Sequence, residues 1–152
     1  MARAWLGLGA NIGDPSAQVR EAVDRLNAWP GIAIVAQSTT LITKPWGKTD
    51  QPDFSNMVVE VETSLAPLEL LDACLGIERE MGRVRDIRWG PRRIDIDVVA
   101  YERLELDTER LHVPHRHAHE RDFVLDPLRE IAPAVAEWIV GRHSAPEAPP
   151  HP

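Results

Sequence analysis

Residues 94–99, with the sequence Ile-Asp-Ile-Asp-Val-Val, constrain the chain more than any other segment. The side chains of a strand alternate between its two faces, so the isoleucines turn to one side and Asp95 and Asp97 to the other. Same-face neighbours on a strand lie roughly 7 Å apart, and two bare carboxylates at that spacing repel unless a cation or a shared proton relieves them. The segment therefore predicts a strand with a core on one face and a charged site on the other.

Five arginines lie within the eleven residues that precede this strand: Arg83, Arg85, Arg88, Arg92 and Arg93. They form a local positive patch in a chain whose net charge is -7. Magnesium binds one or two carboxylates and completes its shell with water and phosphate oxygens, while arginine holds phosphate through paired hydrogen bonds. The acids and the arginines together predict a metal and polyphosphate site.

Alternative roles for these residues stay open. An Asp-x-Asp pair on an exposed strand can be a solvated edge that discourages aggregation, and the arginines can form a salt-bridged loop with Asp86 and nearby glutamates. Histidines crowd around Pro114 and raise the further possibility of zinc: His112, His115, His117 and His119. No cysteine accompanies them and arginines lie among them, which favours phosphate contact or plain exposure over zinc.

The length of 152 residues predicts one domain over 1–143, followed by a flexible proline-rich tail over 144–152. The composition, 43% hydrophobic and 27% charged, is typical of globular proteins. No apolar run approaches the roughly 20 residues of a membrane span, and the N-terminal segment does not resemble a secretory signal, so we expect a cytoplasmic protein without a membrane partner. The pI near 5.3 argues against broad nucleic-acid binding. The lone Cys74 is expected to be a buried apolar side chain.

Hydrophobic periodicity and turn residues predict the order strand, helix, strand, strand, helix, strand. The expected strands cover residues 3–9, 32–43, 54–63 and 94–99. One expected helix begins at Asp14 and Pro15 and ends before Pro30, and the other covers 65–81 and ends at Gly82 in the left-handed conformation. This order predicts a ferredoxin-like α+β sandwich with helices on one face of an antiparallel sheet, followed by a C-terminal extension.

Three further segments are less regular in pattern. Residues 104–113 are expected to add a short strand pair, and residues 121–131 a short helix or turns interrupted at Pro127. Residues 44–53 form a loop long enough to be functional. The glycines at 7, 9 and 13 lack the spacing and the lysine of a phosphate-binding loop, and we interpret them as turn geometry.

Four sequence blocks carry a resemblance to a known family. They are Gly9-Ala10-Asn11-Ile12-Gly13, residues 50–56, residues 82–97, and Val113-Pro114-His115 together with Arg121-Asp122-Phe123. The third block, with ten fixed positions in register with the others, makes chance agreement negligible. Together the blocks resemble 6-hydroxymethyl-7,8-dihydropterin pyrophosphokinase, a folate-pathway family that moves pyrophosphate from ATP to a pterin alcohol.

The resemblance implies a role for each matching residue. Asp95 and Asp97 fall on positions that hold two magnesium ions bridging the ATP phosphates, and Asp95 also borders the pterin. Arg83 and Arg92 match phosphate-holding arginines and, with Asp97, are the expected catalytic residues. The other expected ATP-binding residues are Arg85, Arg88, Trp89, Arg110, His115 and Arg121. The other expected pterin-binding residues are Thr43, Pro45, Trp46, Phe54, Asn56 and Phe123.

The implied reaction is attack of the pterin hydroxymethyl oxygen on the β-phosphorus of ATP, giving pterin diphosphate and AMP. Asp97, or alternatively Asp95, would accept the hydroxyl proton. The loops 44–53 and 83–93 are expected to close over the substrates. Phe54 and Phe123 should stack on the flat pterin, although without the resemblance core packing would be the natural interpretation of both.

The chain departs from the family pattern at Lys44, where a second proline is frequent, and at Arg116, where a tyrosine is frequent. These changes concern loop shape and nucleotide contacts rather than the reaction. Two other classes of function remain open: a ligand-sensing module without chemistry, and a metal-dependent nucleotidyltransferase that releases pyrophosphate instead of AMP. The expected partners are ATP and the pterin, and we expect a monomer, with a weak homodimer as the alternative.

Overall fold

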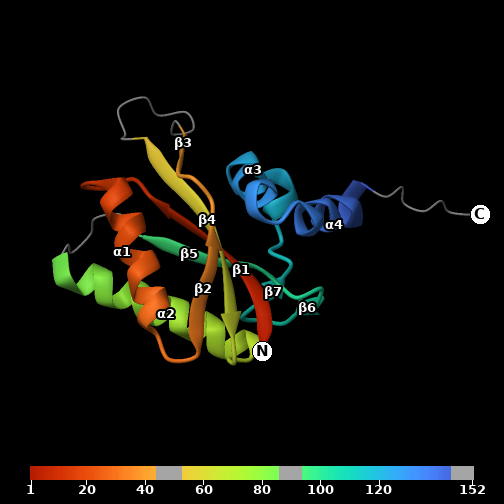
Figure 1. Cartoon of the computed structure of the whole chain (residues 1–152), viewed down its shortest axis with the longest axis horizontal. Coiled ribbons are helices and arrows are strands. Elements are labelled where there is room, and N and C mark those ends of the chain that lie inside the picture. The colour runs from red at the N-terminus through yellow and green to blue at the C-terminus, as the bar shows by residue number, and fades with distance from the viewer. Residues whose placement is uncertain (44–52, 86–93, 145–152) are drawn as a thin grey trace, which may run out of the picture.

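The computed structural model of the chain describes residues 1–43, 53–85 and 94–144 (Figure 1). Several predictions concern residues outside these ranges, namely Lys44, Pro45, Trp46, Arg88, Trp89, Arg92, Arg93 and the proline-rich tail beyond Ser144. Within the three described ranges, no helix is long and apolar enough to cross a membrane.

The described elements confirm the predicted α+β class and the short strand pair within residues 104–113. In chain order they are β1 (Ala2–Ala10), α1 (Pro15–Ala28), β2 (Ile32–Gln37), β3 (Leu41–Thr43), β4 (Phe54–Thr63), α2 (Pro67–Arg85), β5 (Asp95–Tyr101), β6 (Leu106–Asp107), β7 (His112–Val113), a 3-10 turn (Ala118–Glu120), α3 (Asp122–Ile131) and α4 (Pro133–Ser144).

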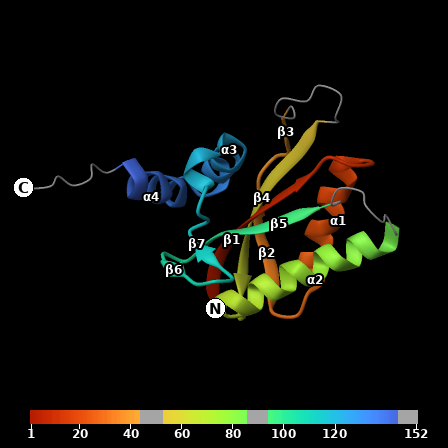
Figure 2. The same cartoon turned by 180° about the vertical axis from the view of Figure 1, so that it is seen from behind.

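The central sheet is antiparallel and has the strand order β2-β4-β1-β5, with β3 paired to β4. Strand β1 lies between β4 and β5, so it is hydrogen-bonded on both sides. Among the described strands, β5 forms one edge of the sheet, and Figure 2 shows α2 running along it. In the β1–β5 register, Gly7 lies opposite Asp97 and Gly9 opposite Asp95.

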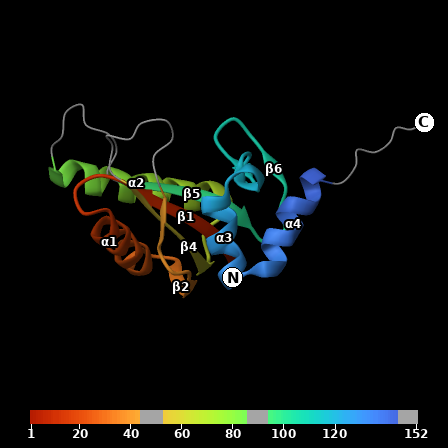
Figure 3. The ribbon, with the colours of Figure 1, turned by 90° about the horizontal axis from the view of Figure 1, so that it is seen from above.

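The two faces of the sheet are covered by different helices (Figures 1 and 3). Leu6 and Leu8 of β1 pack with α1 and α2 in the larger core. On the opposite face, Trp5 of β1 and Val58 of β4 pack with α3 and α4 in a smaller core. Helices α1 and α2 therefore lie on one face, as expected for the two helices of the sandwich, whereas α3 and α4 bury an apolar patch on the other face that would otherwise contact water.

The predicted boundaries of α1 are confirmed by its caps. Asp14 precedes the helix in an extended conformation, and its side chain accepts a hydrogen bond from the Ala17 N–H at 3.2 Å. Pro15 occupies the first helical position, where its missing N–H removes no helical bond. After the helix, Gly31 adopts a φ of 88°, a conformation that favours glycine.

The predicted strand over 32–43 consists of two strands, because Ser38 interrupts it. The Ser38 N–H donates to the Val58 carbonyl at 2.9 Å, and the Ser38 hydroxyl accepts the Val58 N–H at 3.0 Å. Thr39 then turns away and donates through its N–H and its hydroxyl to the Glu130 carboxylate of α3. The interruption thus allows the segment between β2 and β3 to hydrogen-bond to α3. Hydrophobic periodicity does not predict this contact.

Two predicted helix boundaries are wrong. Helix α2 continues through Gly82 to Arg85, and Gly82 does not adopt a positive φ. A glycine inside a helix costs about 1 kcal/mol, which the buried stripe of α2 outweighs. Helix α3 likewise continues through Pro127, which removes one intrahelical hydrogen bond but buries its ring. Helix α4 is not among the predicted elements, because its first residues follow a proline and its pattern is only weakly amphipathic.

Replacement of Ile139 by alanine tests whether α4 belongs to the fold. The side chain is fully buried in the smaller core, so Ile139→Ala should lower the free energy of unfolding by about 2–5 kcal/mol. Leu68→Ala, at a position of α2 that is 39% exposed, is the control and should change it by no more than about 0.5 kcal/mol. Urea unfolding measures both, and equal stability of the two variants would show that α4 does not contribute to the core.

Candidate active site

A cavity of about 940 Å³ lies on the sheet face that α3 covers. Its floor is formed by Asp95 and Asp97 of β5, Gly7 and Gly9 of β1, and Asn56 of β4. Each aspartate lies opposite one glycine, and Gly9 also lies opposite Asn56 on its other side. Because the glycines carry no side chains, the floor is open between the two acids and the amide.

Gly7 and Gly9 line the cavity from inside β1, so the interpretation of both as turn residues is wrong. Both lie inside β1, and a β-carbon on Gly9 would come within 3.0 Å of the Asn56 Oδ1 atom. A glycine inside a strand is typical of a place where a ligand or another backbone approaches closely. The available signal was their alternate spacing within a predicted strand; only Gly13, with a φ of 66°, has turn geometry.

The predicted alternation along β5 is confirmed. Ile94 and Ile96 are buried in the larger core, whereas Asp95 and Asp97 are exposed toward the cavity. Carboxylate oxygens are ligands that suit a hard divalent ion. Among the described residues, no group of three or more histidine, cysteine or acidic side chains could hold a metal ion, so an ion at the two acids would need further oxygen ligands.

The walls of this cavity are aromatic and polar. Phe54 begins β4 and Phe123 lies in the first turn of α3; both line the cavity and are partly buried. Asn56 is 7% exposed, and its amide donates to the Thr43 hydroxyl at 3.0 Å, which fixes the orientation of the amide. Arg121 contributes its guanidinium, 5.7 Å from the centre of the Phe123 ring. Two rings and an amide of fixed orientation in one cavity suit a flat heterocycle.

A second cleft of about 350 Å³ lies along the outer edge of β5, between α2 and residues 110–117. Its lining is rich in basic side chains. Arg110 is paired with Asp72 of α2, and His112 with Asp107. The Arg116 guanidinium lies 2.7 Å from Nε2 of His112. The cleft therefore holds guanidinium and imidazole groups in fixed places, as anion binding requires.

Asp97 and His115 line both the cavity and the cleft. The His115 N–H donates to the Val99 carbonyl at 2.7 Å, and its Nδ1 accepts the His117 N–H at 3.1 Å. Burial lowers the pKa of His115; the charge of Asp97 opposes this shift and the charge of Arg121 adds to it. The ring is therefore neutral at pH 7, and with Nδ1 as acceptor the proton lies on Nε2.

The structure brings most of the described site predictions together. The cavity contains Thr43, Phe54, Asn56, Asp95, Asp97, His115, Arg121 and Phe123. Arg110 lines the second cleft instead. Arg83 and Arg85 lie in the last turn of α2, where the structure describes the backbone alone.

Comparisons with known proteins identify similar sequences. A family model described as 7,8-dihydro-6-hydroxymethylpterin-pyrophosphokinase (HPPK) matches residues 5–133. The 2-amino-4-hydroxy-6-hydroxymethyldihydropteridine pyrophosphokinase of Methylorubrum extorquens is 53% identical over 97% of this chain and 92% of its own length. Proteins with the same name from Pseudomonas aeruginosa and Bacillus subtilis are 47% and 45% identical, and 81% and 79% of their lengths are covered.

Solved structures show the same fold. Plasmodium falciparum HPPK-DHPS with SDX-DHP matches with a TM-score of 0.65 and 17% identity over 88% of this chain. HPPK-DHPS in complex with substrates matches with a TM-score of 0.67 and 14% identity over 86% of this chain. This chain spans 40% of the length of each of those chains.

The lowered pKa of His115 predicts how stability depends on pH. As the pH falls through the ordinary histidine pKa of 6.5, the unfolded chain takes up a proton that the folded His115 does not, so the folded state loses stability. Below the lowered pKa both states are protonated and this loss ends. His115→Asn should therefore show a smaller loss between pH 7.5 and the acid range, measured by urea unfolding at each pH.

Equal pH dependence of His115→Asn and the original protein would contradict the lowered pKa.

Proposed function

The chain belongs to the 7,8-dihydro-6-hydroxymethylpterin-pyrophosphokinase family, and from that membership we infer that it transfers pyrophosphate from ATP to 6-hydroxymethyl-7,8-dihydropterin in folate synthesis. The products are the pterin diphosphate and AMP. We propose that the pterin occupies the cavity and ATP the cleft along β5. The observation that carries this assignment is that Asp97 and His115 line both, because two reacting substrates must meet at shared residues.

The shape of the cavity supports its assignment to the pterin. Phe54 and Phe123 offer two partly exposed rings to a flat heterocycle, and Asn56, fixed by Thr43, offers an amide to its polar edge. An amide both donates and accepts, so it can distinguish the pterin edge from an apolar ring. Gly7 and Gly9 leave room on the floor for the hydroxymethyl group to reach Asp97.

The donor chemistry of Asp95 and Asp97 fits magnesium, which prefers carboxylate, water and phosphate oxygens. We propose that these two residues hold two magnesium ions that arrive with ATP. When bound, the ions supply neutralisation of the phosphate charge. The local scarcity of other ligands among the described residues is consistent with phosphate oxygens completing the coordination shell.

In the proposed reaction, the hydroxymethyl oxygen attacks the β-phosphorus of ATP, and the bond from that phosphorus to the α-phosphate oxygen breaks to release AMP. Asp97, which faces both substrates, accepts the hydroxyl proton. His115, neutral and with its proton on Nε2, donates a hydrogen bond to a phosphate oxygen. Arg83 and Arg92 hold the transferring phosphates, by the resemblance of their sequence block to the family. Orientation and charge stabilisation, rather than a strong base, accelerate the transfer.

We also propose that the core is a ferredoxin-like sandwich. The support is the strand order β2-β4-β1-β5 together with α1 and α2, which each connect two strands and cover one face. On this description, α3 and α4 are an addition that packs on the other face of the sheet. Residues of α3 line part of the proposed pterin cavity.

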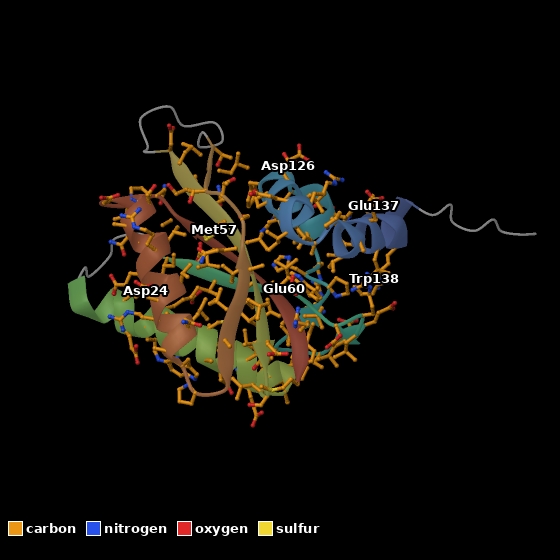
Figure 4. The ribbon with its side chains drawn as sticks, viewed as in Figure 1. Asp24, Met57, Glu60, Asp126, Glu137 and Trp138 are labelled. Atoms are coloured by element: carbon orange, nitrogen blue, oxygen red, sulfur yellow. The ribbon has the colours of Figure 1, made fainter. Side chains whose placement is uncertain are left out.

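Product analysis by phosphorus NMR tests the function. With ATP, magnesium and the pterin, the protein should produce AMP and the pterin diphosphate. Asp97→Ala should reduce this rate by about 100-fold or more with an unchanged melting temperature, because the apolar face of β5 is untouched. Asp24→Ala, on the exposed side of α1 (Figure 4), is the control and should be fully active. Release of pyrophosphate would indicate a nucleotidyltransferase, and ligand binding without turnover a sensing module.

Replacement of Phe123 tests the pterin position. Phe123→Ala should weaken pterin binding by about 1–3 kcal/mol, because a stacked ring is lost, and should weaken ATP binding less, because Phe123 does not line the second cleft. Phe123→Tyr keeps the ring and should retain pterin affinity. Calorimetry of both ligands measures the effect, and an equal loss of ATP and pterin affinity would contradict stacking at this residue.

A further inference from the structure

Strand β5 has one edge paired to β1 and the other facing α2. An edge strand presents N–H groups that have no strand partner. On β5, the outward N–H of Ile96 donates to the Glu78 Oε2 atom of α2 at 2.7 Å. A hydrogen bond to a carboxylate is about twice as strong as one between neutral groups. Glu78 therefore fixes the edge strand to the helix at one particular peptide.

That peptide lies between the two acids of the active site. Asp95 and Asp97 flank Ile96, and each is held from the other side of β5 by its pairing with Gly9 or Gly7 of β1. The Ile96 side chain is buried in the core beneath. With Glu78 on the outer edge, the short segment is held on both edges and from below, and its two carboxylates project from it toward the cavity.

Glu78 lies close to the acids of the active site. It lines the same cleft as Asp97. Burial raises the pKa of the Cys74 thiol to about 12, and the charges of Glu78 and Asp97 add to that shift, so both carboxylates lie within reach of one buried sulfur.

We propose that Glu78 is a positioning residue for pyrophosphate transfer: its carboxylate, by accepting the Ile96 N–H, sets the separation and direction of the Asp95 and Asp97 side chains. The proposal rests on the proposed function and adds a residue that the sequence analysis did not identify. Glu78 acts through the backbone of β5, by way of the Ile96 N–H. Groups that orient metal ligands from the outer shell typically change metal affinity or activity by about 10–100-fold when they are replaced.

Two conservative variants separate position from charge. Glu78→Gln keeps an acceptor oxygen at the same reach and loses the charge, whereas Glu78→Asp keeps the charge and shortens the side chain by one methylene group. If Glu78 positions the acids, Glu78→Asp should raise the magnesium concentration for half-maximal activity by about 10-fold or more. Glu78→Gln should stay within about 3-fold, because a neutral acceptor makes a weaker bond in the same place. The KM for the pterin should change little in both.

Glu80→Asp is the matched control. Glu80 lies on the same helix, but its carboxylate pairs with Arg25 of α1 at 2.8 Å. This variant loses the same methylene group and should keep the magnesium dependence of the original protein. Melting temperatures of all three variants show whether each one folds.

The amide proton of Ile96 gives a readout that does not need activity. In Glu78→Asp, the chemical shift of this proton should change in the direction expected for a weaker hydrogen bond. In Glu78→Gln, the change should be smaller. If the original protein forms no pterin diphosphate, the proposed function fails while this signal still reports the contact. The positioning role is overturned if Glu78→Gln is impaired as much as or more than Glu78→Asp, or if Glu78→Asp retains normal magnesium dependence.

Discussion

The register between β1 and β5 is the constraint on which the site depends. It places Asp97 beside Gly7 and Asp95 beside Gly9, and it turns Ile96 and Leu8 together into the larger core. A slip of one residue would exchange the two faces of β5, so both isoleucines would face the cavity and both acids the core. Burial of the apolar face of β5 therefore favours the same register that directs the two acids to the cavity. The stability of the fold and the geometry of the site depend on one strand pairing.

The face that carries the acids is divided between packing and binding. At one end, Trp5 and Val58 pack under α3 and α4. At the other end the floor carries glycines, acids and an amide, and the α3 residue Phe123 stands over it. Helix α4 lies at the packed end and carries Trp138 (Figure 4). The Arg103 and Arg142 guanidinium groups lie 5.4 and 5.6 Å from the centre of the Trp138 ring. The roof over the cavity is thus anchored by contacts outside the cavity.

Much of this arrangement could be predicted from the sequence where the signal is local. The alternation in β5 and the cap at Asp14 depend on residues a few positions apart, and both predictions are confirmed. The family resemblance supplied the candidate residues of the cavity, which local patterns alone left ambiguous. Phe54 and Phe123, for instance, would otherwise suggest core packing, yet both line the cavity.

The features that were missed depend on contacts between distant segments. The break at Ser38 is stabilised by Val58 and the adjoining turn by Glu130 of α3. The close approach of Gly9 to Asn56 depends on the pairing of β1 with β4. Glu78 resembles any other charged residue of an amphipathic helix until β5 is placed next to it. Such contacts form only in the folded chain, so periodicity and turn chemistry cannot report them.

The central claim is that the pleat of β5 directs two carboxylates to one place where both substrates meet. Crystals grown with manganese in place of magnesium, a non-hydrolysable ATP analogue and the pterin would test it most directly. Anomalous scattering should locate manganese in contact with both the Asp95 and Asp97 carboxylates, between the pterin in the cavity and the phosphates that enter from the cleft. Manganese bound elsewhere, with these carboxylates directed away from both ligands, would contradict the account.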